Sequence, residues 1–276
     1  MPTWLATGKV WHMMSPWFRG ELLGTFLLVF FGCGTVATSV ALEAPVGLFQ
    51  VAIVWGLGLS VAIFLTGGLS GAHLNPAITL AMACFTDFPS KRIPGYILAQ
   101  FLGAFLAAGA VYALFGGAIH QFEVDRGIRR GHVGSEASAM IFGEYYPNPG
   151  GQPLPEERQR YVSHGRALFA EFLGTALLAL AVFGFMAKEN TGGPSAMAPL
   201  AIGLTLSILI CVFAPLTMAG FNPARDLAPR LFSSLAGWKM LPFSLNGLGW
   251  LTVYVLAPCL GALTGGVLGS RLFRSK

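Results

Sequence analysis

Two stretches, SGAHLNPAITLA at residues 70–81 and FNPARDLAP at residues 221–229, place the triplet Asn-Pro-Ala at the head of a short apolar run. Asn is a favoured N-cap residue and Pro a favoured first helical residue, so each triplet predicts the start of a helix. The runs, Asn75 to Phe85 and Asn222 to Phe232, are too short to cross a bilayer, which takes about 20 residues. Each run therefore predicts a half-helix.

The rest of the chain is apolar enough to supply complete membrane spans. Its 276 residues are 54% hydrophobic and 11% charged, with a mean hydropathy of +0.66, whereas a soluble domain carries about 25% charged residues. We expect an all-α membrane protein with six transmembrane helices and two re-entrant half-helices, in contact with the lipid bilayer. Apolar stretches of spanning length fall near residues 21–40, 49–69, 94–117, 168–187, 198–215 and 250–269.

The two halves of the sequence repeat each other. Glu-Leu-Leu-Gly-Thr at residues 21–25 returns as Glu-Phe-Leu-Gly-Thr at residues 171–175, and Asn-Pro-Ala occurs once in each half. With three spans per half, the second copy enters the membrane from the opposite side, so we expect an inverted repeat. The whole chain, 1–276, is predicted to form a single membrane channel domain. Its parts are half one at about 17–117, an external loop at about 118–166, and half two at about 167–270.

The basic residues predict the orientation in the membrane. Lys and Arg beside the spans collect on one side, against only Asp87 and Glu189, and this side is expected to be cytoplasmic. Both termini are then cytoplasmic, in a multi-pass protein of the cell (inner or plasma) membrane. The basic residues are Lys9, Arg19, Lys91, Arg92, Lys188, Arg271, Arg274 and Lys276. The N-terminal residues are interpreted as a retained tail, with Trp4, Trp11 and Trp17 in the interfacial aromatic belt.

The inverted repeat brings the half-helices in from opposite faces, so that both N-termini end near the bilayer centre. The residues that precede them must be extended at membrane depth, which is tolerated only where the backbone lines a water-filled cavity. Their carbonyl groups predict a ladder of hydrogen-bond acceptors for a hydroxylated or water-like solute. These residues are Gly71, Ala72, His73 and Leu74 in half one, and Met218, Ala219, Gly220 and Phe221 in half two.

The facing half-helices also predict how ions are excluded. Each helix N-terminus is equivalent to about +0.5 charge, so the two facing ends together place roughly +1 at the centre. A cation about 5 Å away at an effective dielectric near 20 then meets roughly 3 kcal/mol of repulsion. The side-chain oxygens of Asn75 and Asn222 are used in capping. We expect their amide N–H groups to be donors to the permeant.

Charged residues inside the spans are few and predict specific roles. Arg225 has an apolar counterpart, Ile78, in half one, and an intramembrane Arg is functional by default. It is predicted to line the pore, the alternative being a structural ion pair with Asp226. Asp226 suits the helix dipole and is expected to pair with Arg230.

The repeated acidic residues, Glu21 and Glu171, are expected to accept hydrogen bonds from the extended segment of their own half. The alternatives are a proton relay or a pair of catalytic carboxylates. His73 has no second ligand at metal spacing and is expected to contribute its carbonyl. No metal site, cofactor, nucleic-acid partner or enzyme activity is predicted, since the four cysteines lie in apolar runs and no catalytic motif is present.

These motifs carry a resemblance to a known family. The two Asn-Pro-Ala phrases, the repeated Glu and the six-span plan resemble the aquaporin family over residues 21–270. Asp226, Arg230, YPNP at 146–149 and VWGLG at 54–58 resemble its aquaglyceroporin branch, the glycerol facilitators of bacteria. The resemblance implies a homotetramer with one pore per subunit. It also implies central roles for Asn75, Pro76, Ala77, Asn222, Pro223 and Ala224.

The same resemblance implies an outer selectivity filter made of Trp55, Ile210, Ala219 and Arg225. Facilitators usually have Gly at the position of Ile210 and a second aromatic residue at that of Ala219, so this filter is closer to that of plant nodulin-like intrinsic proteins. The expected function is a passive channel for glycerol, related polyols and water that excludes ions and protons. The alternatives are a water-selective channel, one for ammonia, urea or metalloid hydroxides, and a coupled secondary transporter.

Overall fold

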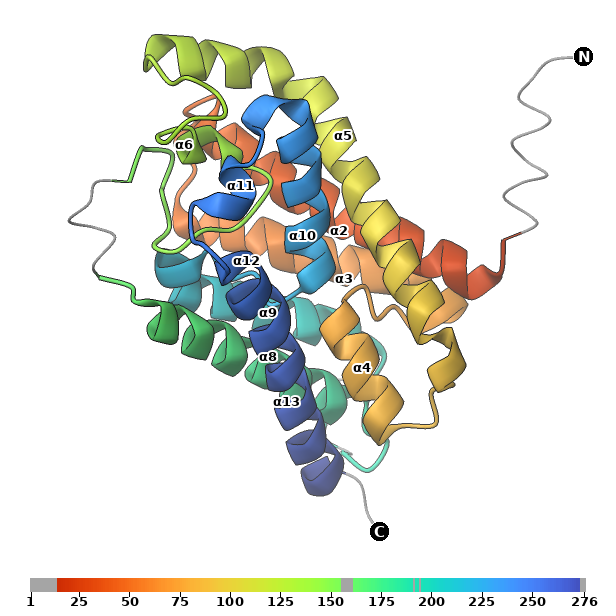
Figure 1. Ribbon diagram of the computed structural model, residues 1–276. Helices are drawn as coiled ribbons and strands as arrows, with labels where there is room; N and C mark the ends of the chain where they lie inside the picture. Colours follow the sequence, from red (N-terminus) through yellow and green to blue (C-terminus); the bar gives the residue numbers. More distant parts are fainter. Residues whose placement is uncertain (1–13, 155–160, 191, 194, 274–276) are drawn as a thin grey trace, which may run out of the picture.

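The computed structural model describes residues 14–154, 161–190, 192–193 and 195–273. Within them six helices are long and apolar enough to cross a membrane (Figure 1), which confirms the predicted all-α class and the six spans. The helices are α2 Pro16–Val40, α3 Leu48–Ser70, α5 Ile93–Asp125, α8 His164–Met186, α9 Ala198–Thr217 and a last span that joins α12 Gly249–Leu251, η4 Thr252–Leu256 and α13 Ala257–Phe273. Trp4, Trp11, Lys9, Arg274 and Lys276 lie outside the described residues.

The two short helices form where the Asn-Pro-Ala triplets predict them. Helix α4 spans Pro76–Phe85 and helix α10 spans Pro223–Ser233, each with Pro as its first residue and Asn as its N-cap. They are 10 and 11 residues long, or about 15 Å at 1.5 Å per residue, half the thickness of the hydrocarbon core. Both are therefore half-helices.

The packing of the helices follows the inverted repeat. In each half the first helix packs on the second and the third, α2 on α3 and α5, and α8 on α9 and α13. The half-helices are exchanged, because α4 packs against α13 of the other half and α10 packs against α5. Helices α3 and α9 complete the contact between the halves. The two repeats are interlocked, and their short helices lie between them (Figure 1).

Glycines at matching positions allow the helices to cross closely. A Cβ added to Gly103 would run into a backbone carbonyl of α2, and one added to Gly261 would meet the equivalent carbonyl of α8. Gly56 and Gly203 face each other in the same way where α3 crosses α9. In lipid, helices associate through close packing of this kind, because apolar side chains gain little by leaving the acyl chains.

The described ends of the chain lie on one face of the molecule. A series of contacts links the starts of α2 and α5, the end of α4, and the ends of α8 and α13: Trp17 with Tyr96, Tyr96 with Phe88, Phe85 with Phe183, and Phe273 with Gly184. We call this the termini-side face. The long loop lies at the other face, where α2 ends and α8 begins, as the ion pair of Arg126 with Glu43 and the contact of Tyr146 with His164 indicate.

The third span is longer than the sequence predicts. The predicted stretch ends at residue 117, whereas α5 continues to Asp125 and takes up the first residues of the predicted loop. The polar residues of this extension are paired: Glu123 accepts two bonds from Arg130 Nε, at 2.9 and 3.1 Å, and forms an ion pair with the same guanidinium. Burial acts to lower the pKa of Arg130, but its contacts with Glu123 and Tyr112 outweigh burial and raise it.

Candidate functional site

The N-termini of the two half-helices are tied to each other by their own cap residues. Asn75 Oδ1 accepts from the N–H of Ala77 at 2.9 Å, and Asn222 Oδ1 accepts from Ala224 at 3.0 Å. The amide of Asn75 donates to the Phe221 carbonyl at 2.9 Å, and that of Asn222 donates to the Leu74 carbonyl at 2.8 Å. Because an amide has two N–H groups and a carbonyl has two lone pairs, each retains one hydrogen-bonding position.

These cross-links differ from the sequence-based expectation. The amide N–H groups of Asn75 and Asn222 were expected to be donors to the permeant, and the carbonyls of the segments were expected to be a ladder of acceptors. Each Asn side chain instead uses one N–H to hold the backbone of the opposite repeat. The sequence could not reveal these bonds, because Asn75 and Phe221 lie 146 positions apart and Leu74 and Asn222 lie 148 positions apart.

The segments before the half-helices are non-helical, but they are not extended throughout, as was expected. Ala72 and Leu74 have φ of 50° and 52°, and Met218, Ala219 and Phe221 have φ of 65°, 59° and 53°. A left-handed conformation costs a non-Gly residue about 1–3 kcal/mol, and it persists only where the surroundings hold it. In each half, four positions that include these left-handed residues separate the last residue of the span from the Asn that caps the half-helix.

Glu21 holds the first segment. Its Oε1 accepts from the N–H of His73 at 2.9 Å and from Ser70 Oγ at 2.7 Å. Its Oε2 accepts from the N–H of Leu74 and from Gln100 Nε2, both at 2.7 Å. Hydrogen bonds to a charged group contribute about 1.5–3 kcal/mol each, which is enough to offset the strain of the segment.

Glu171 holds the second segment in the same way. Its carboxylate accepts from the N–H groups of Gly220, at 2.9 Å, and Phe221, at 2.7 Å, and from Thr217 Oγ1 at 2.6 Å. The hydrogen bonds expected of both repeated acids are thus present. Their hydroxyl partners, Ser70 and Thr217, were missed by sequence reasoning, although both occupy the last residue of a span.

The glycine of each repeated motif has a matching role. A Cβ on Gly24 would run into the side chain of Leu74, and a Cβ on Gly174 would run into the ring of Phe221. Leu74 and Phe221 are the residues that precede the two Asn residues. In each half, one turn of helix supplies a carboxylate that accepts from the backbone N–H of this residue and a glycine that leaves room for its side chain. This explains why Glu-x-x-Gly recurs as a unit in the sequence.

His73 is fixed beside the first segment. Its ring nitrogen Nδ1 lies 3.2 Å from Thr79 Oγ1, and the ring contacts Phe88 and Tyr96. Groups of three or more His, Cys, Asp or Glu that could hold a metal ion do not occur in the described part of the chain.

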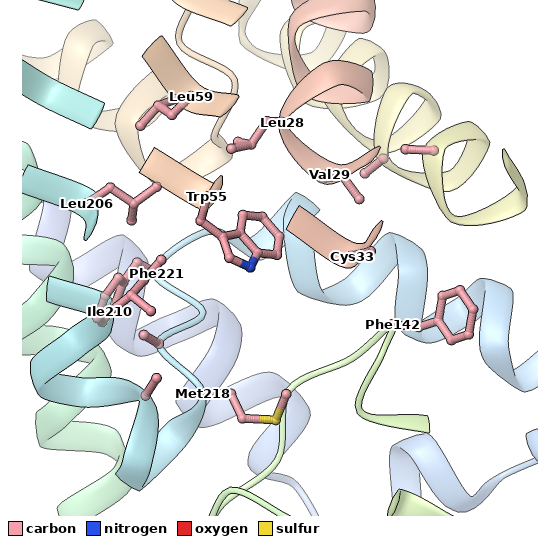
Figure 2. Close-up of a cluster of buried hydrophobic side chains, with 14 of the residues drawn as sticks. Leu28, Val29, Cys33, Trp55, Leu59, Phe142, Leu206, Ile210, Met218 and Phe221 are labelled. Atoms are coloured by element: carbon pink, nitrogen blue, oxygen red, sulfur yellow. The ribbon is translucent and has the colours of Figure 1, made fainter. Parts of the chain in front are cut away.

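Two cavities approach each other along the non-helical segments. One, of about 340 Å³, opens on the termini side and is lined by residues 71–75 and 219–222 together with apolar side chains. The other, of about 460 Å³, lies under the loop and includes Met218. Trp55, Ile210 and Arg225 line both cavities. Figure 2 shows Trp55 projecting inward from α3 and Ile210 from α9, in a cluster that also includes Phe221 and Met218.

Arg225 lies at this shared wall and is buried, with 5% of its surface exposed. Its guanidinium lies 3.9 Å from the centre of the Trp55 ring system. It forms a close ion pair with Glu144 of the long loop. Asp226 pairs instead with Arg230, whose Nη2 and Nε donate to it at 2.8 and 3.0 Å, so the alternative of an Arg225–Asp226 ion pair is wrong.

Sequence reasoning missed Glu144. The sequence AMIFGEYYP at positions 139–147 could have indicated it, because Glu144 is the single acidic residue among apolar and aromatic neighbours. Such an acid needs a partner when it is buried. Nothing local in the sequence identifies that partner as Arg225.

Six spans, two half-helices that meet at their N-termini, and two cavities joined at a buried arginine define a multi-pass membrane channel. The chain belongs to the major intrinsic protein family, whose model matches residues 15–269. It is 40% identical to the glycerol uptake facilitator protein of Pseudomonas aeruginosa over 247 residues, 89% of this chain and 84% of the relative. The facilitator of Haemophilus influenzae is also 40% identical, over 250 residues and 89% of each chain.

Among solved structures, the chain is similar to the X-ray structure of the aquaglyceroporin from Plasmodium falciparum. The TM-score is 0.77, at 26% identity, over 93% of this chain and 96% of that one. The relatives and the solved structure therefore agree with the resemblance to the aquaglyceroporin branch.

Proposed function

We propose that this protein is a passive channel for small uncharged solutes, namely glycerol, related polyols and water, and that it excludes ions and protons. The observation that carries the proposal is the pair of cavities that share Trp55, Ile210 and Arg225 and continue along two carbonyl-bearing segments. The names of the bacterial relatives favour glycerol as the solute.

The chemistry of the wall suits an amphipathic solute. Trp55 and Ile210 offer an apolar surface for a carbon backbone, while Arg225 offers N–H donors to its hydroxyl groups. Carbonyls of residues 71–74 and 218–221 are proposed to accept hydrogen bonds along the path, and Asn75 and Asn222 to donate the N–H that each retains. Trp55, Ile210, Ala219 and Arg225 are proposed as the selectivity filter.

Ion exclusion is proposed to rest on the half-helix N-termini. The cap residues Asn75 and Asn222 hold these ends together across the repeat, so their partial positive charges face the same short stretch of path. By the approximation of roughly 3 kcal/mol given above, a cation or hydronium is repelled there even before its desolvation is counted.

The test is a stopped-flow comparison of water and glycerol flux in proteoliposomes. Both fluxes should exceed those of protein-free vesicles, and glycerol should not accumulate beyond its external concentration. Fast water flux with glycerol at the protein-free background would identify a water-selective channel instead. Accumulation of glycerol driven by an imposed proton or sodium gradient would identify a coupled transporter.

The assembly and placement are part of the proposal. The exposed apolar faces of the spans favour contact with the lipid of the cell membrane. The resemblance to the aquaporin family supports a homotetramer with one pore per subunit, and the basic residues beside the spans support cytoplasmic termini. We propose that the two interlocked halves together form a single channel domain. Light scattering coupled to size exclusion, with the detergent contribution subtracted, should give a protein mass near four chains.

A further inference from the structure

The constriction between the cavities contains a negative charge that sequence reasoning did not anticipate. Glu144 is 1% exposed, and its Oε1 forms the close ion pair with Nη1 of Arg225. Its other oxygen, Oε2, is buried without a hydrogen-bond partner among the described residues. Arg225 is therefore the group that compensates the charge of this carboxylate.

The backbone around Glu144 is held by charged groups of α10. The N–H of Glu144 donates to Asp226 Oδ1 at 2.8 Å, and its carbonyl accepts a short hydrogen bond from Arg230 Nη2. The next N–H, that of Tyr145, donates to the Met218 sulfur at 3.2 Å. The loop is thus fixed both to the half-helix and to the non-helical segment, with the carboxylate directed at Arg225.

The charges at this point balance. Arg225 and Arg230 are positive, Glu144 and Asp226 are negative, and all four are buried. The guanidinium of Arg225 borders both cavities, while the residues described as lining them do not include Glu144. Arg225 therefore lies between Glu144 and the path, and Glu144 influences the path only through its ion pair with Arg225.

We propose that Glu144 is a positioning residue that makes the constriction electroneutral, so that the half-helix ends and Arg225 together do not form a binding site for small anions. The inference rests on the proposed channel function. Without Glu144, the full charge of Arg225 adds to the partial positive charges of the two helix ends. A small anion would then bind in the path and obstruct neutral solutes.

The test uses Glu144→Gln, which keeps the size of the side chain and removes its charge. Glycerol flux is measured in proteoliposomes as nitrate replaces gluconate at constant ionic strength. Wild-type flux should be the same in both salts. One uncompensated charge several ångströms away is worth on the order of tenfold in anion binding. Nitrate should therefore inhibit glycerol flux through Glu144→Gln at concentrations about tenfold below any that affect the wild type.

Two control variants separate charge from structure. Glu123→Gln removes a buried carboxylate of another ion pair, with Arg130, outside both cavities, and should stay insensitive to nitrate. Glu144→Asp keeps the charge and should also stay insensitive, even if its glycerol flux differs from wild type. A merely structural role for Glu144 would alter flux without creating nitrate sensitivity.

The proposal is overturned if Glu144→Gln is folded and conducts but ignores nitrate, or if Glu123→Gln becomes equally sensitive. If the wild type passes water but no glycerol, the proposed function fails, and nitrate inhibition is then read on water flux. If Glu144→Gln aggregates, the double variant Glu144→Gln/Arg225→Met should recover folded protein in detergent. Failure of the double variant to recover would also contradict the pairing.

Discussion

At the scale of single residues, the properties of the constriction depend on side chains from different elements. Trp55 is supported from behind by α2, because Gly32 leaves just enough room for its ring. Ile210 lies on α9 and is 4% exposed. A change of a few atoms at either position should alter the width of the path without removing any element of the fold.

The first prediction concerns Gly32. In Gly32→Ala the added methyl group would overlap the Trp55 indole, and over-packing of this kind costs about 1–3 kcal/mol. We expect the ring to move toward the path, so glycerol flux should fall more than water flux. Gly34→Ala, two residues away with open space around it, should behave like wild type. Equal loss of both fluxes in the two variants would contradict this explanation.

The second prediction concerns Ile210. Ile210→His places a polar ring where the apolar wall lies, and should suppress glycerol flux while water continues to pass. Ile210→Val, which removes one methylene group, should retain glycerol flux. Stopped-flow light scattering of both variants provides the measurement. Undiminished glycerol flux in Ile210→His would show that Ile210 does not border the narrowest point.

At the scale of elements, the non-helical segments are the strained parts of the molecule, and each is held by one carboxylate. The segment before α10 has three left-handed non-Gly residues, whose strain amounts to several kcal/mol. Glu171 is fully buried and accepts from two backbone N–H groups. The half-helix is positioned as much by this acceptor as by its own cap.

The third prediction follows from that arrangement. Glu171→Gln keeps the shape, but it turns one acceptor oxygen into a donor that faces backbone N–H groups. Losing a charged acceptor costs about 1.5–3 kcal/mol per hydrogen bond, so the thermal midpoint in detergent should fall by several degrees. The exposed Glu189→Gln should leave the midpoint unchanged. A stable Glu171→Gln variant with normal flux would mean that the segment is held by packing alone.

At the scale of the whole molecule, the inverted repeat has consequences for topology. The described ends of the chain share one face, and the long loop covers the other. The proposed orientation places the termini-side face in the cytoplasm and the long loop outside. That assignment comes from the basic residues of the termini-side face.

The fourth prediction tests the orientation. Val133 is 82% exposed in the loop, and Glu189 is exposed beyond α8. Val133→Cys should react with a membrane-impermeant maleimide in intact cells, whereas Glu189→Cys should react only after permeabilisation. The unsubstituted protein, with its four native cysteines, gives the background. The reverse labelling pattern would place both termini outside the cytoplasm.

The sequence by itself determined the class of fold and the local features of the candidate site. Asn-Pro-Ala at the head of runs too short to span, repeated in each half, predicts two half-helices, because cap chemistry and helix length are local properties. Six apolar stretches predict six spans for the same reason. The carboxylates of Glu21 and Glu171 could be assigned to their segments because each motif recurs at an equivalent place.

Only the tertiary structure decided the contacts between distant residues. Two features join positions far apart in the chain: the ion pair of Arg225 with Glu144, and the hydrogen bonds of Asn75 and Asn222 across the repeat. The left-handed backbone before each half-helix depends on contacts of the same kind. Spacing and propensity describe a residue and its near neighbours. A buried charge selects its partner by proximity in space, which arises only when the two halves interlock.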